Sequence, residues 1–252
     1  MSLRTALIQL DIAWETPQEN YRRAERRIQE AAALGAQWVV LPEMFATGFS
    51  MAAGRLAEAP GGPTQQFLKE TAEGLGIWIL GGVAEVQAGR PVNNALLVSP
   101  TGTVQRYTKI HPFSFAGEHL HYSAGQQTET FEIEGLRITP FICYDLRFPE
   151  SFRERADQTD VFVVIANWPE RRRAHWQALL KARAIENLCY VLGVNRVGSG
   201  GDLHYTGDSV VHDPWGETLA YAAGQESVLV AELDAAFVQN VRSTFPALQD
   251  RR

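Results

Sequence analysis

The chain has few cysteines, no long apolar run and no excess of basic residues. Cys143 and Cys189 are its only cysteines among 252 residues. A disulfide framework is therefore excluded, and a reducing compartment is the better expectation. The densest apolar stretch, VFVVIA at 161–166, is far too short to span a bilayer, and the N-terminal MSLRTALIQLDIAW has no signal-peptide core. We expect a soluble cytoplasmic protein with no membrane partner.

The charge balance argues against nucleic acid as a partner. The formal net charge is -6, from 23 basic and 29 acidic residues, whereas nucleic-acid binding needs a basic face. Hydrophobic residues make up 45% of the chain and charged residues 21%, which are ordinary values for a protein with a sizeable core. The length suits one large domain over residues 1–252, and no linker or internal repeat interrupts it.

Apolar patterning predicts more strands than helices. Thr16 and Glu19 in TPQE form a capping box that starts a helix, and Gly35 ends it. Further helices are predicted over 63–73, after Pro149, over 173–187 and after Asp234. Strands are predicted over 5–10, 37–41, 77–80, 136–143, 161–166, 190–194, 209–212 and 227–233, with a hairpin over 94–98 and 103–107. Sheets covered by helices, in one α/β or α+β domain, follow from this pattern.

Three predicted strands lead into reactive side chains. Glu43 follows WVVLP, Lys109 follows VQRYT, and Cys143 ends ITPFI. Ligand sites in folds of strands and helices favour the carboxyl ends of strands. A carboxylate, an ammonium and a thiol brought together there form a set of groups suited to acyl transfer.

The chemistry gives each of these groups a role. A free thiol has a pKa of about 8.5, so a base such as the Glu43 carboxylate must take the proton of Cys143. The thiolate then attacks an amide carbon, and Lys109 with the backbone N–H of Tyr144 stabilises the oxyanion. Losing one such donor typically costs about 2.7–4 kcal/mol of barrier. Taken singly, each residue has a plainer interpretation: a solvated carboxylate, a surface ammonium and a small core thiol.

Several segments resemble one family. LPEMFATGF around Glu43, RYTKIHPF around Lys109 and FICYDLRFPE around Cys143 resemble the three signature segments of the nitrilase (carbon–nitrogen hydrolase) superfamily, in the same order. The likeness continues through GGVAE, NNALLVSPTG, ARAIEN and GDSVVHDPWGE, and so covers nearly the whole chain. It implies an α-β-β-α sandwich that forms a four-layer homodimer. It also implies the roles given above to the three residues, with no cofactor and no metal.

The resemblance extends to a second glutamate and to a substrate class. Glu118, in FAGEHLHYSAG, matches a glutamate that the family places near its lysine, and this match implies that it positions Lys109 and the attacking water. ANWPERRRAHW and EHLHYSAG look most like the bacterial omega-amidase branch. That branch hydrolyses the terminal amide of short dicarboxylic acid monoamides, chiefly 2-oxoglutaramate.

Such a substrate needs a positive group for its far carboxylate. Arg172 best matches the branch, since guanidinium binds carboxylate through two parallel hydrogen bonds. The neighbouring Arg171 and Arg173 are interpreted as solvated, and Arg147 as a structural residue that ties the nucleophile turn to a nearby acid. Two aromatic residues are predicted to wall the pocket or to belong to the core: Trp168 and Phe115.

Other signals are weaker, and other functions stay open. Cys189 is interpreted as core, beside a helix seam of Ala174, Ala178, Ala182 and Ile185. The histidines at 119, 121, 204 and 212 give no closed set of metal ligands, and the glycines at 198–201 do not form a nucleotide-binding loop. A carbamoyl-amino-acid, aliphatic or glutathione-derived amide remains an alternative substrate, and a non-catalytic binding protein is an alternative of another class. A cysteine peptidase is disfavoured, because no Cys/His pair lies in a recognisable context.

Overall fold

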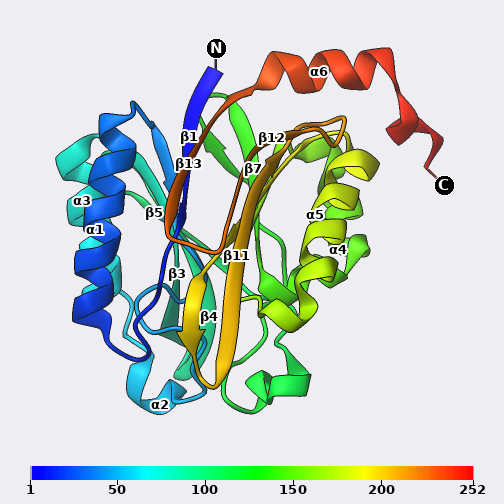
Figure 1. Cartoon of the computed structure of the whole chain (residues 1–252). Helices are drawn as coiled ribbons and strands as arrows, with labels where there is room; N and C mark the ends of the chain where they lie inside the picture. The colour runs from blue at the N-terminus through cyan, green and yellow to red at the C-terminus, as the bar shows by residue number, and fades with distance from the viewer. Residues whose placement is uncertain (1, 252) are drawn as a thin grey trace.

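Two β-sheets pack face to face in the computed structural model, which describes residues 2–251 (Figure 1). The first sheet has six strands, in the order β13 (Ser227–Asp234), β1 (Ser2–Gln9), β2 (Trp38–Val40), β3 (Trp78–Gln87), β4 (Arg90–Val98) and β5 (Val104–Thr108). The second has seven, in the order β10 (Val197–Gly200), β11 (Leu203–His212), β9 (Tyr190–Asn195), β8 (Val161–Ala166), β7 (Leu136–Ile142) and β6 (Phe131–Ile133), with β12 (Thr218–Ala223) paired to β11.

Helices cover the outer faces of both sheets. In Figure 1, α1 (Pro17–Ala33) and α3 (Pro63–Leu75) lie outside the first sheet, and α4 (Pro149–Arg155) and α5 (Arg173–Asn187) outside the second. The short α2 (Ala53–Leu56) lies at one end of the sandwich, and α6 (Ala235–Thr244) crosses the other end. The layers therefore follow the order α-β-β-α, which confirms the predicted fold class. Within residues 2–251, no helix has the length and apolarity needed to cross a membrane.

Strand alternation explains how the layers hold together. In β1, Leu3 and Leu7 belong to the core between the sheets, whereas Ala6 and Ile8 pack in the core under the helices. Successive side chains of a strand point to opposite faces, so a strand that is covered on both sides is apolar at nearly every position. On the helix side, α1 contributes Ile28 to the same core as Ala6.

The predicted start of α1 is correct, but its predicted cap is wrong. The helix begins at Pro17, yet the Thr16 side chain accepts no hydrogen bond from the first turn. Its hydroxyl donates instead to the carbonyl of Trp14 at 2.9 Å, and the Thr16 backbone has φ -124° and ψ 75°. Glu19, the other half of the predicted box, pairs with Arg23 at 2.9 Å.

The predicted seam on α5 is also wrong, although Cys189 itself is fully buried as expected. Ala174, Ala178 and Ile185 are exposed, and Ala182 is only partly buried. The helix buries a different face, which contains Trp176, Leu180 and Ala184. Alanine spacing misled the prediction, because the large side chains between the alanines pack on the sheet.

Strand β3 is longer than predicted, because it continues through Gly81 and Gly82. The strand was predicted over 77–80, whereas it runs over Trp78–Gln87 and pairs with β4 along its length. A Cβ added to Gly82 would lie 2.5 Å from the Cα of Glu43. Glycine is therefore required at this position, because the chain around Glu43 passes directly over the strand.

Candidate active site

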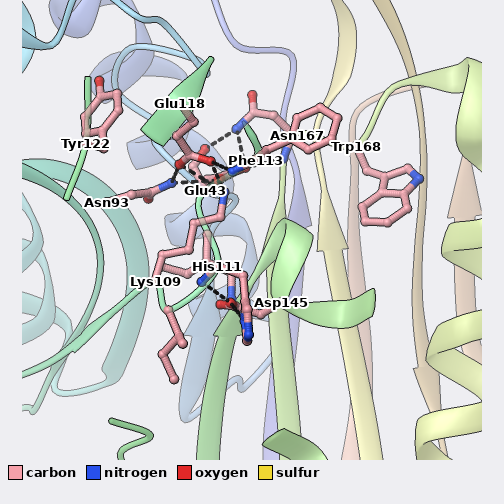
Figure 2. Close-up of polar contacts among 12 residues, drawn as sticks. Glu43, Asn93, Lys109, His111, Phe113, Glu118, Tyr122, Asp145, Asn167 and Trp168 are labelled. Atoms are coloured by element: carbon pink, nitrogen blue, oxygen red, sulfur yellow. Dashed lines mark hydrogen bonds and ion pairs between the residues drawn. The ribbon is translucent and has the colours of Figure 1, made fainter. Parts of the chain in front are cut away.

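Four strands from the two sheets end at one place. Glu43 lies beyond β2 and Lys109 follows β5, both in the first sheet, while Cys143 follows β7 and Asn167 follows β8 in the second. Glu43, Lys109 and Asn167 point toward one another in Figure 2. The site therefore lies across the junction between the sheets, at the carboxyl ends of the strands.

A buried cluster of charges forms its centre. Lys109 Nζ lies 3.0 Å from Glu43 Oε1 and 2.9 Å from Glu118 Oε2, and all three side chains are almost wholly inaccessible to solvent (Figure 2). Asn93 Nδ2 donates to Glu43 Oε1 at 2.8 Å and to Glu118 Oε1 at 3.0 Å. Burial alone would lower the pKa of Lys109, but Glu118 and Glu43 outweigh it and raise that pKa. Lys109 therefore carries its positive charge, held between two carboxylates.

Cys143 begins the turn that follows β7. Its φ is +47°, a left-handed conformation that is strained for a residue with a side chain. Burial and the negative charge of Glu43 raise the pKa of its thiol well above the ordinary value, although Lys109 and the Asn167 backbone N–H act in the opposite direction. The thiol is therefore protonated at neutral pH, and its attack on a substrate requires a base.

Asp145 fixes the turn that carries the thiol. Its buried carboxylate accepts hydrogen bonds from the Tyr107 hydroxyl at 2.7 Å and from the Ile142 backbone N–H at 3.0 Å. It also accepts from the His111 backbone N–H at 2.9 Å, and its Oδ1 lies 2.8 Å from His111 Nδ1 (Figure 2). One carboxylate thus joins the nucleophile turn to the segment just beyond Lys109.

Three polar residues of the site were missed by the sequence analysis: Asn93, Asn167 and Asp145. Asn167 holds the second oxygen of Glu43, because its backbone N–H donates to Oε2 at 2.8 Å and its side chain donates to the Glu43 carbonyl at 2.6 Å. The available signal was an amide or acid directly beside a buried apolar strand, as in VVIAN and ICYD. Such residues are usually interpreted as turn formers, so the signal is weak.

A cavity of about 310 Å³ opens beside Cys143. Apart from Cys143 and Asn167, its wall is mostly aromatic and cationic. The aromatic members are Trp14, Phe49, Phe113, Tyr144, Trp168 and Tyr205, and the cationic members are Arg147, Arg171 and Arg172. Among the described residues, no aspartate or glutamate lines it. The cavity therefore offers positive charge and flat apolar surfaces to a small molecule.

The structure places three of the four predicted substrate-binding residues in this wall and excludes one. Tyr144, Trp168 and Arg172 line the cavity. Phe115 does not, since 79% of its surface is exposed, and the prediction for it is corrected. Phe113 takes its place, because a short turn at Ser114–Ala116 reverses the chain and leaves Phe115 on the outside.

One of the interpretations given to nearby arginines, that of Arg147, is also corrected. Arg147 forms no ion pair with an acid in residues 2–251; it lines the cavity, lies over the Trp168 ring at 4.8 Å and contacts His175 Nδ1 at 3.1 Å. Arg173 is exposed, as predicted, and its guanidinium pairs with the buried Asp208 at 2.7 Å. Arg171 is exposed, as expected, at the cavity mouth.

Comparison with known proteins agrees with this geometry. Residues 4–243 match the model of the carbon-nitrogen hydrolase family. The chain is 44% identical over 252 residues to the omega-amidase YafV of Escherichia coli K12, with 98% of this chain and 96% of that protein covered. It is 36% identical over 256 residues to the 2-oxoglutaramate amidase of Bacillus subtilis 168, with 100% and 98% covered.

Solved structures show the same fold. The CN-hydrolase superfamily protein XC1258 of Xanthomonas campestris superposes with a TM-score of 0.95 at 40% identity, covering 100% of this chain and 98% of that one. That protein was solved with an arsenic adduct in its active site. The two-sheet sandwich, the family match and these relatives define the class of the protein, an enzyme that hydrolyses amides. The chain belongs to the carbon–nitrogen hydrolase family.

Proposed function

We propose that this protein is an omega-amidase, which hydrolyses the terminal carboxamide of a short dicarboxylic acid monoamide such as 2-oxoglutaramate. The products are the dicarboxylic acid, here 2-oxoglutarate, and ammonia. The cationic wall of the cavity beside Cys143, which has no acidic residue among those described, is the observation that carries the proposal. Relatives named as an omega-amidase and a 2-oxoglutaramate amidase, both matched over nearly the whole chain, support it.

The proposed acylation step uses Cys143 as nucleophile and Glu43 as base. As Sγ attacks the amide carbon, its proton passes to Glu43 and the carbonyl oxygen becomes negative. Lys109 and the backbone N–H of Tyr144 stabilise that oxygen. The intermediate collapses when the C–N bond breaks and Glu43 returns the proton to the departing nitrogen. Ammonia leaves, and a thioester remains on Cys143.

Hydrolysis of the thioester uses the same base. A water molecule gives a proton to Glu43 as it attacks the thioester carbon. When the C–S bond breaks, Glu43 returns the proton to Sγ, so the thiol is restored and the carboxylic acid leaves. Glu118 is proposed to act on Lys109, which it contacts through both carboxylate oxygens at 2.9 and 3.1 Å, and to orient the attacking water. Glu118 also keeps that lysine charged while Glu43 carries the transferred proton.

Arg172 is the proposed partner of the substrate's free carboxylate. Its guanidinium lies over the Phe113 ring at 5.0 Å and borders the same cavity as Cys143. Burial, followed by the positive charge of Arg171, lowers the pKa of Arg172. A carboxylate bound here would relieve the repulsion between the neighbouring guanidinium groups, so an anionic amide is the substrate that this wall favours.

Replacing Arg172 tests the substrate class. In Arg172→Met, we expect kcat/KM for 2-oxoglutaramate to fall about 30- to 150-fold, since a hydrogen-bonded charge pair contributes about 2–3 kcal/mol. For an uncharged amide such as butyramide, the value should stay within about threefold, because no carboxylate contact is lost. Ammonia release measures both.

The exposed neighbour supplies a matched control for this experiment. Arg171→Met removes the same charge at the cavity mouth, where water screens it, so a loss of only a few-fold is expected. A wild-type preference for butyramide over 2-oxoglutaramate would contradict the proposed substrate class. Equal losses on both substrates in Arg172→Met would contradict the role of this residue alone.

The homodimer is part of the proposal, with the surface of α5 as its interface. This α5 surface is defined by exposed apolar side chains on α5, on β12 and on the segments near them: Ala174, Ala178, Ile185, Trp215, Leu219, Tyr221 and Phe245. Trp215 and Phe245 lie with ring centroids 6.1 Å apart. A group of exposed apolar side chains of this kind favours a partner, and in a twofold dimer the same surface of both copies would meet. The helix layers of two copies would then meet in a four-layer assembly.

Sedimentation velocity checks this assembly. We expect a particle of twice the 28.0 kDa chain mass for the wild type and of one chain mass for the double variant Ile185→Asp/Leu219→Asp, because two buried charges would oppose association. Leu34→Asp, an exposed leucine just beyond α1, is the matched control and should remain dimeric. A monomeric wild type would refute the dimer.

The proposal also covers the domain organisation and the location of the protein. Residues 1–252 form one carbon–nitrogen hydrolase domain, which is supported by the match over residues 4–243. The protein acts in the cytoplasm, which is supported by two free cysteines, and fractionation of cells that produce the protein would test this location.

A further inference from the structure

Tyr205 presents a polar group to the cavity that nothing in the proposed mechanism uses. It lies on β11, its surface is only 2% exposed, and it lines the same cavity as Cys143 and Arg172. Within residues 2–251, its hydroxyl has no hydrogen-bond partner. The hydroxyl oxygen is nevertheless not among the fully inaccessible polar atoms that lack a partner, so a small molecule in the cavity can reach it. A buried tyrosine normally bonds its hydroxyl, so an unpartnered one at a cavity wall indicates a contact made by a ligand.

The ring that carries this hydroxyl is held rigidly. Tyr205 pairs with Gly198 across the β10–β11 hairpin, and the guanidinium carbon of Arg196 lies 4.5 Å from its ring centroid. Arg196 is itself wholly buried and donates to the carbonyls of Ile12 at 2.8 Å and Ser199 at 3.0 Å. A side chain fixed on a strand in this way gives a hydroxyl at a defined position, as a specificity contact requires.

We propose that the Tyr205 hydroxyl donates a hydrogen bond to the 2-oxo oxygen of the substrate and so selects 2-oxo monoamides over monoamides that lack this group. The inference rests on the proposed function and deepens it. The substrate would then be held at three points: its carboxamide at Cys143, its carboxylate at Arg172 and its oxo group at Tyr205.

The chemistry of the phenol fits a donor. Burial raises the pKa of Tyr205 to about 12, so the hydroxyl keeps its proton throughout the neutral range. The lysine and arginine side chains nearby donate but cannot accept, and a neutral donor suits the weakly basic oxygen of a ketone. When a site has a buried donor, a substrate without the matching acceptor leaves that donor unpaired and binds less well.

Tyr205→Phe removes the hydroxyl and nothing else. We compare kcat/KM for 2-oxoglutaramate and for glutaramate, which differs only in lacking the oxo group. The variant should lose about five- to tenfold on 2-oxoglutaramate and stay within twofold on glutaramate, since a hydrogen bond from a buried donor contributes about 1–1.4 kcal/mol. Any ring closure of 2-oxoglutaramate in solution lowers its effective concentration equally for the wild type and for Tyr205→Phe. It therefore cancels when the two proteins are compared on this substrate.

A second tyrosine separates this role from a structural one. Tyr107→Phe removes a hydroxyl that donates to Asp145 at 2.7 Å, so it should lower the melting temperature and affect both substrates alike. Tyr205→Phe should leave the melting temperature unchanged, since no protein contact is lost. Equal losses on both substrates in Tyr205→Phe, or no loss on either, would overturn the oxo contact while the omega-amidase proposal stands. A wild type that cleaves neither substrate would remove the proposed function and this inference with it.

Discussion

Cys143→Ala is expected to lower kcat/KM for ammonia release from 2-oxoglutaramate by about 10⁴-fold or more, because the covalent route is lost with the nucleophile. The wild type, mixed with substrate and quenched with acid, should show the mass of the intact chain increased by one acyl group. The same increase should be absent from the variant. Together, the two measurements assign the thioester to one atom.

Cys189 provides the matched control for that experiment. It is also fully buried, but it lies in the core beside the end of α5, away from the cavity wall. Cys189→Ala should keep turnover within about twofold and still trap the acyl group, at a stability cost of about 1 kcal/mol. Retained turnover in Cys143→Ala, or an acyl group found on Cys189, would end the proposed mechanism.

Glu43→Gln is expected to separate proton transfer from nucleophilicity. Turnover should fall about 10²- to 10⁴-fold, because neither the thiol nor the departing nitrogen exchanges its proton with an amide side chain. Yet the thiol should become easier to ionise. The negative charge of Glu43 raises the pKa of Cys143, whereas Lys109 lowers it, so removal of the carboxylate charge lowers that pKa.

The pH dependence of alkylation measures this second effect. The rate at which iodoacetamide modifies Cys143, followed by mass spectrometry, should rise at a lower pH in Glu43→Gln than in the wild type. Glu132→Gln, on the exposed side of β6, loses the same charge far from the thiol and should change neither turnover nor the profile. A profile displaced to higher pH in Glu43→Gln would contradict the statement that the Glu43 charge raises the pKa of the Cys143 thiol.

The sequence predicted the layers well, because burial on both faces leaves a strong mark on a strand. VFVVIA at 161–166 became β8 with the predicted bounds, and the hairpin around Ser99 became β4 and β5. Glu43 and Cys143 were identified because each adjoins such a strand, Lys109 because it follows a hairpin strand, and Glu118 because a family resemblance singled it out. The structure brings Glu43, Lys109 and Glu118 into direct contact, with the charges of all three acting on the Cys143 thiol.

What the sequence did not predict depends on side-chain direction. Phe113 and Phe115 differ by two positions in one loop, and only the fold decides that the first faces the cavity and the second faces solvent. Arg147 is four residues from the thiol and carries no mark that distinguishes a structural arginine from one at a cavity wall. Tyr205 lies 62 positions beyond Cys143 in the chain, on a strand whose hydrophobic pattern is that of any core tyrosine.

The division of the site between the sheets also has a consequence for the order of synthesis. Glu43 and Lys109 belong to strands made early, whereas Cys143 follows them, and β13, made last, returns to pair with β1 at the edge of the first sheet. In a nascent chain, Glu43 and Lys109 are therefore synthesised before Cys143. Cys143 is in turn synthesised before β13, the strand that completes the first sheet. The active site can therefore form only when the first sheet packs against the second.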